Sequence, residues 1–489
     1  MVDCCVYKKS IVIWTAVGLL VCPGSLCRAQ KQAPKWPEQI RVVLDSTRPL
    51  EYDRGERLPL YLWQAMDPGP LDEDSAEELV KTLDERGVGL VTSWNPGNRE
   101  KSLAESATIA AAQKKLGLRV NIDATRCLYS FFNGDPRTAH IDDEDKPFWD
   151  TSFGKKNMGC PFAIEFRKAQ IAEQVEYFAR AFKDKGLDVD FVFADWEIDG
   201  PIEFNEAHAA SKRCRRCREN VKNIDDFEEF QKTLRQLRCE LQRQVYAEPV
   251  KAGFLGVFVG TYGVYPHDGY RYWYDYYEYF VDGQPHRADQ RARYRKWYDE
   301  FPETGYTFAM PVVYTWERIF DWYDYADTDY RWFYNMLLVA SNAGENTPAG
   351  TPVISFVHWH TIEDDNIKSE TVQFSEEKYK ELLWHMLLRG TDTFFLWCGK
   401  QEAAKEIRLV HEVYAEAQQY GRFLSEGTPI NFNVPRQPGT VVSGLRLGDR
   451  VLVRRTDFAV TNEPVEIAVG NRKIKVAVAP RQCRIVSLR

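Results

Sequence analysis

The sequence lacks the features that mark several large classes of protein. No Gly-rich dinucleotide fingerprint and no P-loop follows any apolar run, which counts against a nucleotide-binding sheet. No internal repeat and no low-complexity tract stands out. An excess of one charge is also missing, because the net charge of −8 is modest and acidic and basic residues are interspersed. We therefore expect no nucleic-acid partner.

Long hydrophobic runs are scarce, and the one at the N-terminus resembles a targeting signal. Lys8 and Lys9 precede an apolar run from Ile11 to Cys22, and small residues follow. The run is too short for a confident membrane span, and no second stretch is long enough to cross a bilayer. We predict a signal peptide over residues 1–29, with a retained membrane anchor as the alternative. The mature protein is then exported (periplasmic, extracellular or surface-associated), with no membrane span.

Cysteine is present in an odd number once this leader is removed. Seven remain: Cys127, Cys160, Cys214, Cys217, Cys239, Cys398 and Cys483. An odd count in an exported chain implies at least one free thiol or an intermolecular link. Cys214 and Cys217 form a CxxC motif with His208 six residues before it, but no second CxxC or close His pair completes a zinc pattern. We favour a local disulfide or a link to Cys239, and we expect no metal and no cofactor.

The chain length suits a large barrel with an accessory module. At 489 residues it exceeds one ordinary domain, whereas a barrel needs roughly 250–400 residues. Aromatic residues make up 13% of the chain, with 14 Trp and 25 Tyr. Flat apolar rings with polar tips suit a sugar-binding cleft, because they stack on the C–H faces of pyranoses.

From about residue 57, short apolar runs alternate with amphipathic stretches, which is typical of βα units and a parallel sheet. Eight runs are strand candidates: Leu58–Trp63, Gly89–Ser93, Arg119–Ile122, Asp190–Ala194, Ala252–Gly260, Tyr306–Tyr314, Pro352–Trp359 and Thr393–Trp397. Five stretches between them indicate helices: Asp74–Arg86, Ser102–Leu116, Ala163–Lys185, Asp225–Tyr246 and Phe374–Leu388. The alternation predicts an α/β fold, a (β/α)8 TIM-type barrel over residues 57–427.

The character of the sequence changes after Gly427. Short alternating runs separated by turn residues indicate antiparallel strands. They are Val441–Leu447, Arg450–Arg454, Val465–Val469, Lys473–Val478 and Cys483–Leu488. We predict a small antiparallel, β-sandwich-like domain over residues 428–489, packed on the barrel. Residues 30–56 are interpreted as a linker and an N-terminal edge segment.

Polar and aromatic side chains follow the expected strands. A barrel keeps its active site at the carboxyl ends of its strands, so residues just after the apolar runs are candidate substrate ligands. They are Trp63, Trp94, Asn95, Asp123, Tyr262, Tyr314, Trp316, Glu317, His358, His360 and Trp397. The dense aromatic stretch from Tyr262 to Phe280 adds packing and further sugar subsites. This composition predicts a polar cleft with stacking walls.

Asp195 and Glu197 directly follow the fourth expected strand. Residues i and i+2 of a strand face the same side, which puts these carboxylates roughly 6–7 Å apart. Repulsion between them raises the pKa of one, so a protonated acid stands beside an ionised partner. Protonation of a glycosidic oxygen needs that pair. We predict a glycoside hydrolase of polysaccharides or oligosaccharides, with Glu197 as general acid/base.

The segment Phe193-Ala194-Asp195-Trp196-Glu197, with Trp63 and Trp397 on the first and last strands, resembles the hyaluronidase-type barrel glycosidases. More loosely, it resembles the chitinase and N-acetylhexosaminidase barrels. The resemblance implies that Glu197 acts as acid and later as base. It implies that Asp195 orients the 2-acetamido group of the substrate, which is the nucleophile.

The same resemblance implies two binding roles. Tyr262 or Tyr314 would hydrogen-bond the acetamido carbonyl, and Trp397 would form the floor of the pocket. The hyaluronidase family continues its motif with a second Glu and a Trp, whereas this chain continues Ile198-Asp199-Gly200-Pro201. The identity of the sugar therefore stays open.

Other mechanisms stay open as well. A conventional retaining enzyme pairs its acid with a nucleophile about 5 Å away, for which Glu317 and Glu363 are candidates. Asp123 is the candidate base of an inverting arrangement. Two further hypotheses are a non-catalytic polysaccharide-binding barrel and a metal-dependent hydrolase using His358 and His360.

Overall fold

The computed structural model describes a large part of the chain: residues 36–64, 66–128, 134–150, 157, 159–163, 165–196, 207–267, 280–281, 284–285, 299–317, 320, 325–362, 371–398 and 403–488. Trp36–Arg489 belong to one unit. The predicted signal peptide, Glu197, Asp199, Glu363 and most of the aromatic stretch after His267 lie outside the described residues.

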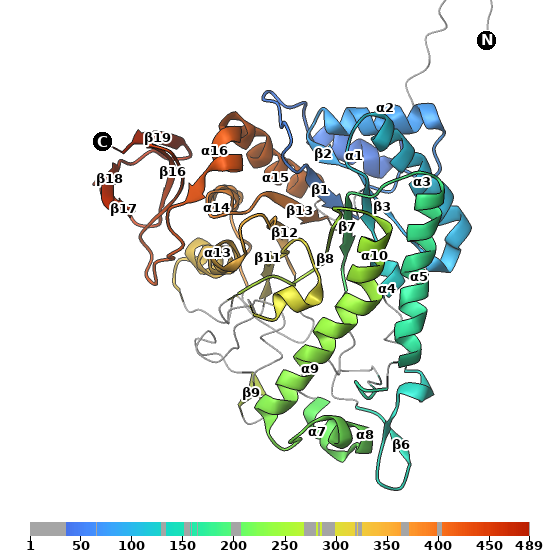
Figure 1. Ribbon diagram of the computed structural model, residues 1–489. Coiled ribbons are helices and arrows are strands. Elements are labelled where there is room, and N and C mark those ends of the chain that lie inside the picture. The colour runs from blue at the N-terminus through green and yellow to red at the C-terminus, as the bar shows by residue number, and fades with distance from the viewer. Residues whose placement is uncertain are drawn as a thin grey trace, which may run out of the picture. The chain divides into compact units, whose positions relative to one another are not determined.

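Parallel strands in two sheets occupy the centre of this unit (Figure 1). The sheet orders are β11-β12-β13-β1-β2 and β3-β4-β7-β8, and neighbouring strands in both are parallel. The strands are β1 (Leu60–Trp63), β2 (Val88–Gly89), β3 (Val91–Ser93), β4 (Asn121–Asp123), β7 (Phe191–Ala194), β8 (Phe258–Thr261), β11 (Val312–Trp316), β12 (Ile354–Ile362) and β13 (Thr393–Trp397). The predicted parallel α/β architecture is thus confirmed.

The second predicted strand is divided between the two sheets. Val88–Gly89 pairs with β1, whereas Val91–Ser93 pairs with β4. The segment from Val88 to Ser93 therefore passes from one sheet into the other. Each strand neighbours the strand before or after it in the sequence, and the last strand, β13, neighbours the first, as successive βα units give.

Two other strand boundaries differ from the prediction for local reasons. The expected strand Ala252–Gly260 begins as helix α10 (Glu248–Gly253), and Gly256 has a φ of 73° that turns the chain into β8. The expected strand Tyr306–Tyr314 becomes regular only at Val312. Pro311 precedes that residue and has no N–H to donate to a ladder.

Helices surround the strands in Figure 1. They include α2 (Glu73–Asp84), α3 (Arg99–Lys115), α5 (Glu165–Asp184), α9 (Phe227–Gln242), α13 (Thr328–Asn346), α14 (Glu376–Leu387) and α15 (Ala403–Ala417). Side-chain caps start several of them: Asp72 accepts from Ser75 N, and Ser375 from Lys378 N. Within the described residues, no helix is both long enough and apolar enough to span a bilayer.

The N-terminal edge corrects one expectation. Part of the predicted linker is helix α1 (Glu38–Ser46), which packs against α15. Ile40 and Val43, three residues apart and therefore on one face, are fully buried in the core. A short helix with one apolar stripe is stabilised by such packing rather than by its own propensity.

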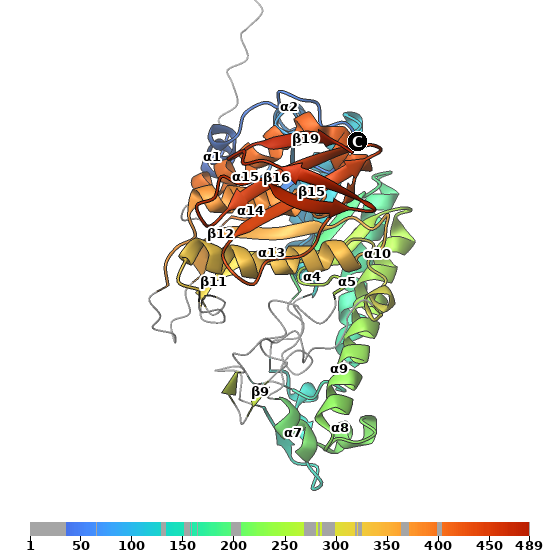
Figure 2. The same ribbon diagram turned by 90° about the vertical axis from the view of Figure 1, so that its left-hand side faces the viewer.

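The five strands predicted after Gly427 are present, as β15 (Thr440–Leu447), β16 (Arg450–Asp457), β17 (Val465–Val469), β18 (Arg472–Val476) and β19 (Cys483–Ser487). A short strand missed from the sequence, β14 (Thr428–Pro429), completes the sheet β14-β15-β16-β19, and β17 pairs with β18. The strands are antiparallel, as predicted. Figure 2 shows this sheet beside α13 and α14.

Buried polar side chains join this sheet to α14. Arg389, which has no exposed surface, donates from Nε to Ser443 Oγ (2.7 Å) and from Nη1 to Ser341 Oγ (2.8 Å). His385 lies 2.7 Å from Ser443 Oγ through Nδ1 and 3.0 Å from Thr456 Oγ1 through Nε2. These bonds specify one orientation of the sheet, because each lost partner would leave a buried polar atom unsatisfied.

His385 predicts acid sensitivity. Burial holds its pKa well below the ordinary value, and the nearby cations of Arg389, Arg454 and Lys378 add to the effect. Below about pH 6.5 the unfolded chain binds a proton that the folded chain does not. For each pH unit by which the solution is acidified below that value, this group should lower the free energy of unfolding by about 1.4 kcal/mol. Urea unfolding at several pH values measures the slope, and His385→Gln should flatten it; an unchanged slope would contradict this assignment.

Candidate functional site

Aromatic side chains fill the space between the inner faces of the two sheets. Phe193 of β7 lies with its ring centroid 4.1 Å from that of Phe395 of β13, and Tyr61 of β1 stacks on Phe191 at 4.4 Å. Side chains of a strand alternate between its two faces, so Trp63, Asp195 and Trp397 follow on the same inner side. The inner side therefore changes from apolar to polar as the strands approach their carboxyl ends.

Six predicted residues meet at these carboxyl ends, and we name them the strand-end cluster: Trp63, Asp123, Tyr262, Tyr314, His358 and Trp397. Hydrogen bonds connect them: Trp63 Nε1 donates to Asp123 Oδ2 (3.0 Å), Tyr262 and Tyr314 bond through their hydroxyls (2.9 Å), and His358 Nδ1 bonds Trp397 O (2.8 Å). The ring centroid of Tyr314 is 5.8 Å from that of Trp397, and the centroid of His358 is 4.6 Å from that of Trp397. Trp63 and Trp397 remain partly exposed, so their rings offer surface for a ligand.

Asp123 holds the neighbouring groups of the cluster in place. Its Oδ2 accepts from Trp63 Nε1 and from Ser93 Oγ (3.4 Å), and its Oδ1 accepts from Thr125 N (2.8 Å). Burial raises the pKa of this carboxyl, although the hydrogen bonds oppose that shift. With both oxygens occupied, Asp123 is better placed to orient Trp63 than to activate a water as the base of an inverting mechanism.

Asp195 is held in place next to this carboxylate. Its backbone N donates to Thr125 Oγ1 (2.8 Å), so Thr125 bonds both Asp123 and Asp195. Trp196, on the opposite side of the strand, is buried, and its N donates to Thr261 Oγ1 (3.3 Å). These bonds fix the backbone that leads to Glu197, and Asp195 itself is half-buried.

A glutamate that the sequence did not reveal anchors His358. Glu406 of α15 has no exposed surface, and its Oε1 accepts from Trp359 N (2.9 Å) and His360 N (2.6 Å). His358 Nδ1 lies 2.9 Å from the same oxygen and 2.8 Å from Trp397 O. Both partners are acceptors, so Nδ1 of His358 carries a proton.

His358 and His360, the residues of the metal-dependent hypothesis, lie two residues apart on β12. The ring centroids of His358 and His360 are 6.4 Å apart, and His360 is exposed. Within the described ranges, these two residues belong to no group of three or more metal-ligating side chains. The described geometry thus gives the metal-dependent hydrolase hypothesis no support at this position.

No family model matches the chain, and no curated protein sequence matches it. Similar solved structures include α-L-fucosidase isoenzyme 2 from Paenibacillus thiaminolyticus (14% identity, 76% of this chain and 51% of that chain, TM-score 0.43) and a GH36 α-galactosidase from Geobacillus stearothermophilus in complex with stachyose (10%, 92% and 57%, 0.45). Bee venom hyaluronidase is similar at 12% identity over 69% of this chain and 99% of that chain, with a TM-score of 0.34. This chain spans about half of the first two.

These similar structures are glycoside hydrolases. Because their TM-scores are below 0.5, the function of this chain rests on the geometry of its own site and not on these structures. The particular likeness to hyaluronidases that the Asp-Trp-Glu segment implies stays a prediction.

Four predicted ligands lie apart from the exposed surface of the cluster. Trp94 is fully buried and stacks on Phe178 of α5 with centroids 5.6 Å apart, so its ring has no free face for a sugar. This is a correction with a simple cause: Trp94 is one residue past Ser93 and points to the opposite side of the strand. Asn95 caps the turn Pro96–Asn98 by accepting from Gly97 N (3.0 Å). Trp316 and Glu317 are almost fully buried after Tyr314.

Gln64 is a site residue outside our candidate set. Its φ of 66° is uncommon for a residue with a side chain, and its Oε1 accepts from Trp397 Nε1 (3.1 Å). Strained backbone of this kind often stands at functional sites. Its place directly after the first strand was the only signal for it in the sequence.

Proposed function

We propose that the chain is an exported glycoside hydrolase of polysaccharides or oligosaccharides, with Glu197 as general acid/base and Asp195 orienting the substrate or intermediate. The strand-end cluster carries the proposal. It contains two partly exposed indole rings and a buried tyrosine pair, and the indole of Trp63 is hydrogen-bonded to Asp123. Asp123 lies on β4, whose neighbour β7 leads to Asp195. Aromatic faces and carboxylates together are what a glycosidase cleft requires.

The proposal includes a closed (β/α)8 barrel. Inner side chains of one sheet pack on those of the other, as Tyr61 does on Phe191. On the side away from β2 and β3, Thr307 N donates to Val259 O (2.9 Å) and Met310 N to Val264 O (3.0 Å), which links β8 to the segment before β11. We take the two sheets as the two halves of one barrel, with the cluster at its carboxyl-terminal mouth.

In the proposed reaction a sugar stacks on Trp63 and Trp397, and the protonated carboxyl of Glu197 donates its proton to the glycosidic oxygen. The 2-acetamido oxygen of the substrate attacks the anomeric carbon as that bond breaks. Asp195 accepts a hydrogen bond from the acetamido N–H and stabilises the positive charge of the cyclic intermediate. Glu197, now ionised, removes a proton from the water that opens it.

One observation favours this substrate-assisted route over an inverting mechanism with Asp123 as the base. Both carboxylate oxygens of Asp123 already accept hydrogen bonds, from Trp63, Ser93 and Thr125, which leaves the carboxylate poorly placed to activate a water. Tyr262 and Tyr314, whose hydroxyls lie together in the cluster, are the candidates to bind the acetamido carbonyl.

A screen of the full chain against polysaccharides, with detection of new reducing ends, tests the proposal. We expect hydrolysis of at least one glycan that contains an N-acetylhexosamine, because that sugar supplies its own nucleophile. Glycan binding without any new reducing ends, at acid and at neutral pH, would favour the non-catalytic binding barrel instead. Loss of activity in His358→Ala or His360→Ala together with loss of a bound metal ion from that variant would favour the metal-dependent alternative.

A further inference from the structure

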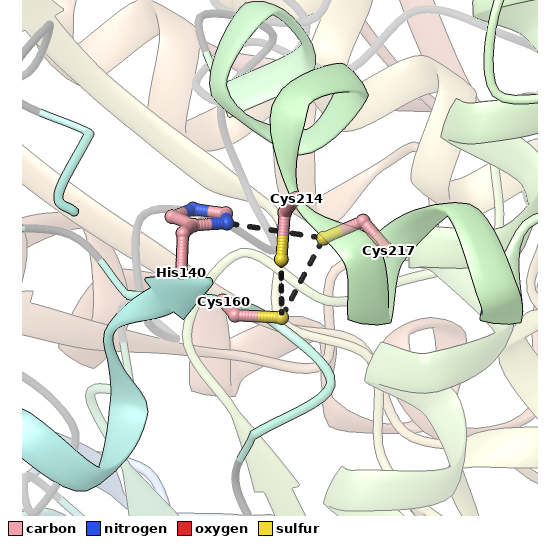
Figure 3. A group of neighbouring side chains, drawn as sticks. All are labelled: His140, Cys160, Cys214 and Cys217. Atoms are coloured by element: carbon pink, nitrogen blue, oxygen red, sulfur yellow. Dashed lines mark hydrogen bonds between the residues drawn. The ribbon is translucent and has the colours of Figure 1, made fainter. Parts of the chain in front are cut away.

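Four metal-ligating side chains converge in a part of the fold that the proposed reaction does not use. The Nδ1 or Nε2 of His140 and the Sγ atoms of Cys160, Cys214 and Cys217 all lie within 4.8 Å of one another. Figure 3 shows the three sulfur atoms and the imidazole pointing toward a common centre. Histidine and cysteine in this number are the ligand set of structural zinc sites.

The ligands come from two segments that are far apart in the sequence. His140 lies on β5 (His140–Ile141) and Cys160 in the loop that follows β6 (Pro147–Phe148), between β4 and α5. Cys214 and Cys217 lie at the start of α8 (Arg215–Asn220), after α7 (Ala207–Arg213) and between β7 and α9. In Figure 1 these elements lie together at the far ends of α5 and α9.

Hydrogen bonds within the protein fix both segments independently of any metal. Cys160 N donates to Thr138 O (2.7 Å), and a Cβ on Gly159 would lie 2.4 Å from that same oxygen, so only glycine fits there. Arg216 Nη1 donates to Ala139 O (2.9 Å), which joins α8 to the residue before His140. The four ligand atoms are therefore held in position by the fold.

The distances between the ligand atoms match a tetrahedral metal site rather than a disulfide. Cys160 Sγ is 3.5 Å from Cys217 Sγ and 3.8 Å from Cys214 Sγ, and Cys217 Sγ is 3.9 Å from His140 Nδ1. Zn–S bonds of about 2.3 Å place the sulfur atoms of a tetrahedral site about 3.8 Å apart. A disulfide needs about 2.05 Å and uses only two of the three thiols.

Burial adds a second argument. His140, Cys214 and Cys217 have no exposed surface and Cys160 has 1%. An apolar shell surrounds the sulfur atoms, formed by Ile141, Phe148, Phe162, Ala163 and Ile224. Three thiolates in such a shell need a cation, and a divalent ion lowers the charge of the group from −3 to −1. The basic segment from Arg213 to Arg218 covers the same helix and suits that residual charge.

We propose that His140, Cys160, Cys214 and Cys217 bind a structural zinc ion. Four protein ligands close the coordination sphere, so the ion has no open position for substrate. The site joins the segment that follows β4 to the segment that follows β7. Those two strands lead to Asp123 and Asp195, so the ion secures the loops beside the strand-end cluster without entering the reaction.

The proposed site differs from the sequence-based expectation of no metal. His208, the ligand considered there, instead places Nε2 2.7 Å from Ile224 O. Cys239, considered as a disulfide partner, has its Sγ 3.8 Å from Glu300 O. The true partners of the CxxC motif lie 54–77 residues before it, where spacing alone gives no signal.

Metal analysis of the purified full chain tests the site. We expect about one zinc per chain, and loss of that zinc in Cys214→Ser and Cys217→Ser. Cys239→Ser removes another buried thiol and should keep the metal. Replacing zinc by Co²⁺ should give the thiolate-to-cobalt absorption of a tetrahedral site, and that absorption should weaken in Cys160→Ser. Cys217→His, which keeps a ligand, should retain metal even if the serine variants fail to fold.

Measurements on the unaltered protein decide the outcome without any variant. In the zinc interpretation, a chelator releases one ion and makes three further cysteines reactive toward a thiol reagent in the folded protein. Purified protein with no bound zinc and no uptake of Co²⁺ would overturn the proposal. So would a peptide map that shows Cys160 in a disulfide with Cys214 or Cys217. Neither result bears on Glu197, so failure here leaves the proposed hydrolase intact.

Discussion

Replacing Glu197 by Gln is expected to lower kcat roughly 10²–10⁴-fold, the usual contribution of a general acid/base. Glutamine keeps the size of the side chain but has no proton for the leaving glycosidic oxygen and cannot activate water. The backbone that leads to it is anchored through Asp195 N and Trp196 N, so the fold should be unaffected. KM should change little, since the cluster supplies the stacking surfaces. Initial rates on a glycan identified by the screen measure the effect.

Glu173→Gln is the matched control for this experiment. It makes the same chemical change on the exposed face of α5, where Glu173 pairs with Arg99, and it should leave kcat unchanged. Asp195→Asn should also lower kcat if the acetamido group is the nucleophile. Turnover by Glu197→Gln at the rate of the unaltered protein would remove Glu197 from the reaction and direct attention to Glu363.

Most of the fold was predictable because local patterns carry it. Apolar runs separated by amphipathic stretches marked the parallel strands and their order, and short alternating runs marked the C-terminal sheet. The boundaries that differed depend on single residues, such as Gly256 and Pro311, whose backbone properties interrupt an otherwise continuous apolar run. Helix α1 was missed because its stability comes from α15, which lies more than 350 residues further along the chain.

The candidate site was predictable only where strand position decides the environment. Trp63, Asp123 and Trp397 meet as expected, because parallel strands present their carboxyl ends on the same side. Trp94 was expected in the cleft but points to the other side of the strand, because side chains alternate along β3 and Trp94 comes one residue after Ser93. Glu406 had no such signal, since it reaches the cluster from a helix.

The zinc ligands illustrate the same limit. A CxxC motif is local and visible in the sequence. Its partners His140 and Cys160 are brought to it only by the packing of the β5–β6 segment against α8. Tertiary contacts of this kind decide whether a pair of cysteines is a metal site or a disulfide.

The largest effect on stability is expected from Glu381→Ala. Arg454 donates to this carboxylate from Nε (2.9 Å) and Nη2 (2.7 Å), and Thr456 Oγ1 donates to it at 2.6 Å. The side chains of Arg454 and Glu381 are only 3% and 5% exposed, so the variant leaves a buried guanidinium without its counter-charge. The free energy of unfolding should fall by about 3–5 kcal/mol.

Urea unfolding of Glu381→Leu, of Arg454→Met and of the double variant Glu381→Leu/Arg454→Met separates the interaction energy of the ion pair from the cost of burying its charges. An apolar pair of similar volume removes the charge and its desolvation together, so the double variant should be much closer to the unaltered protein than either single variant. Additive losses in the double variant would show that the two side chains act independently. The C-terminal sheet would then be held beside α14 by the bonds of Arg389 and His385 to Ser443 and by apolar contacts.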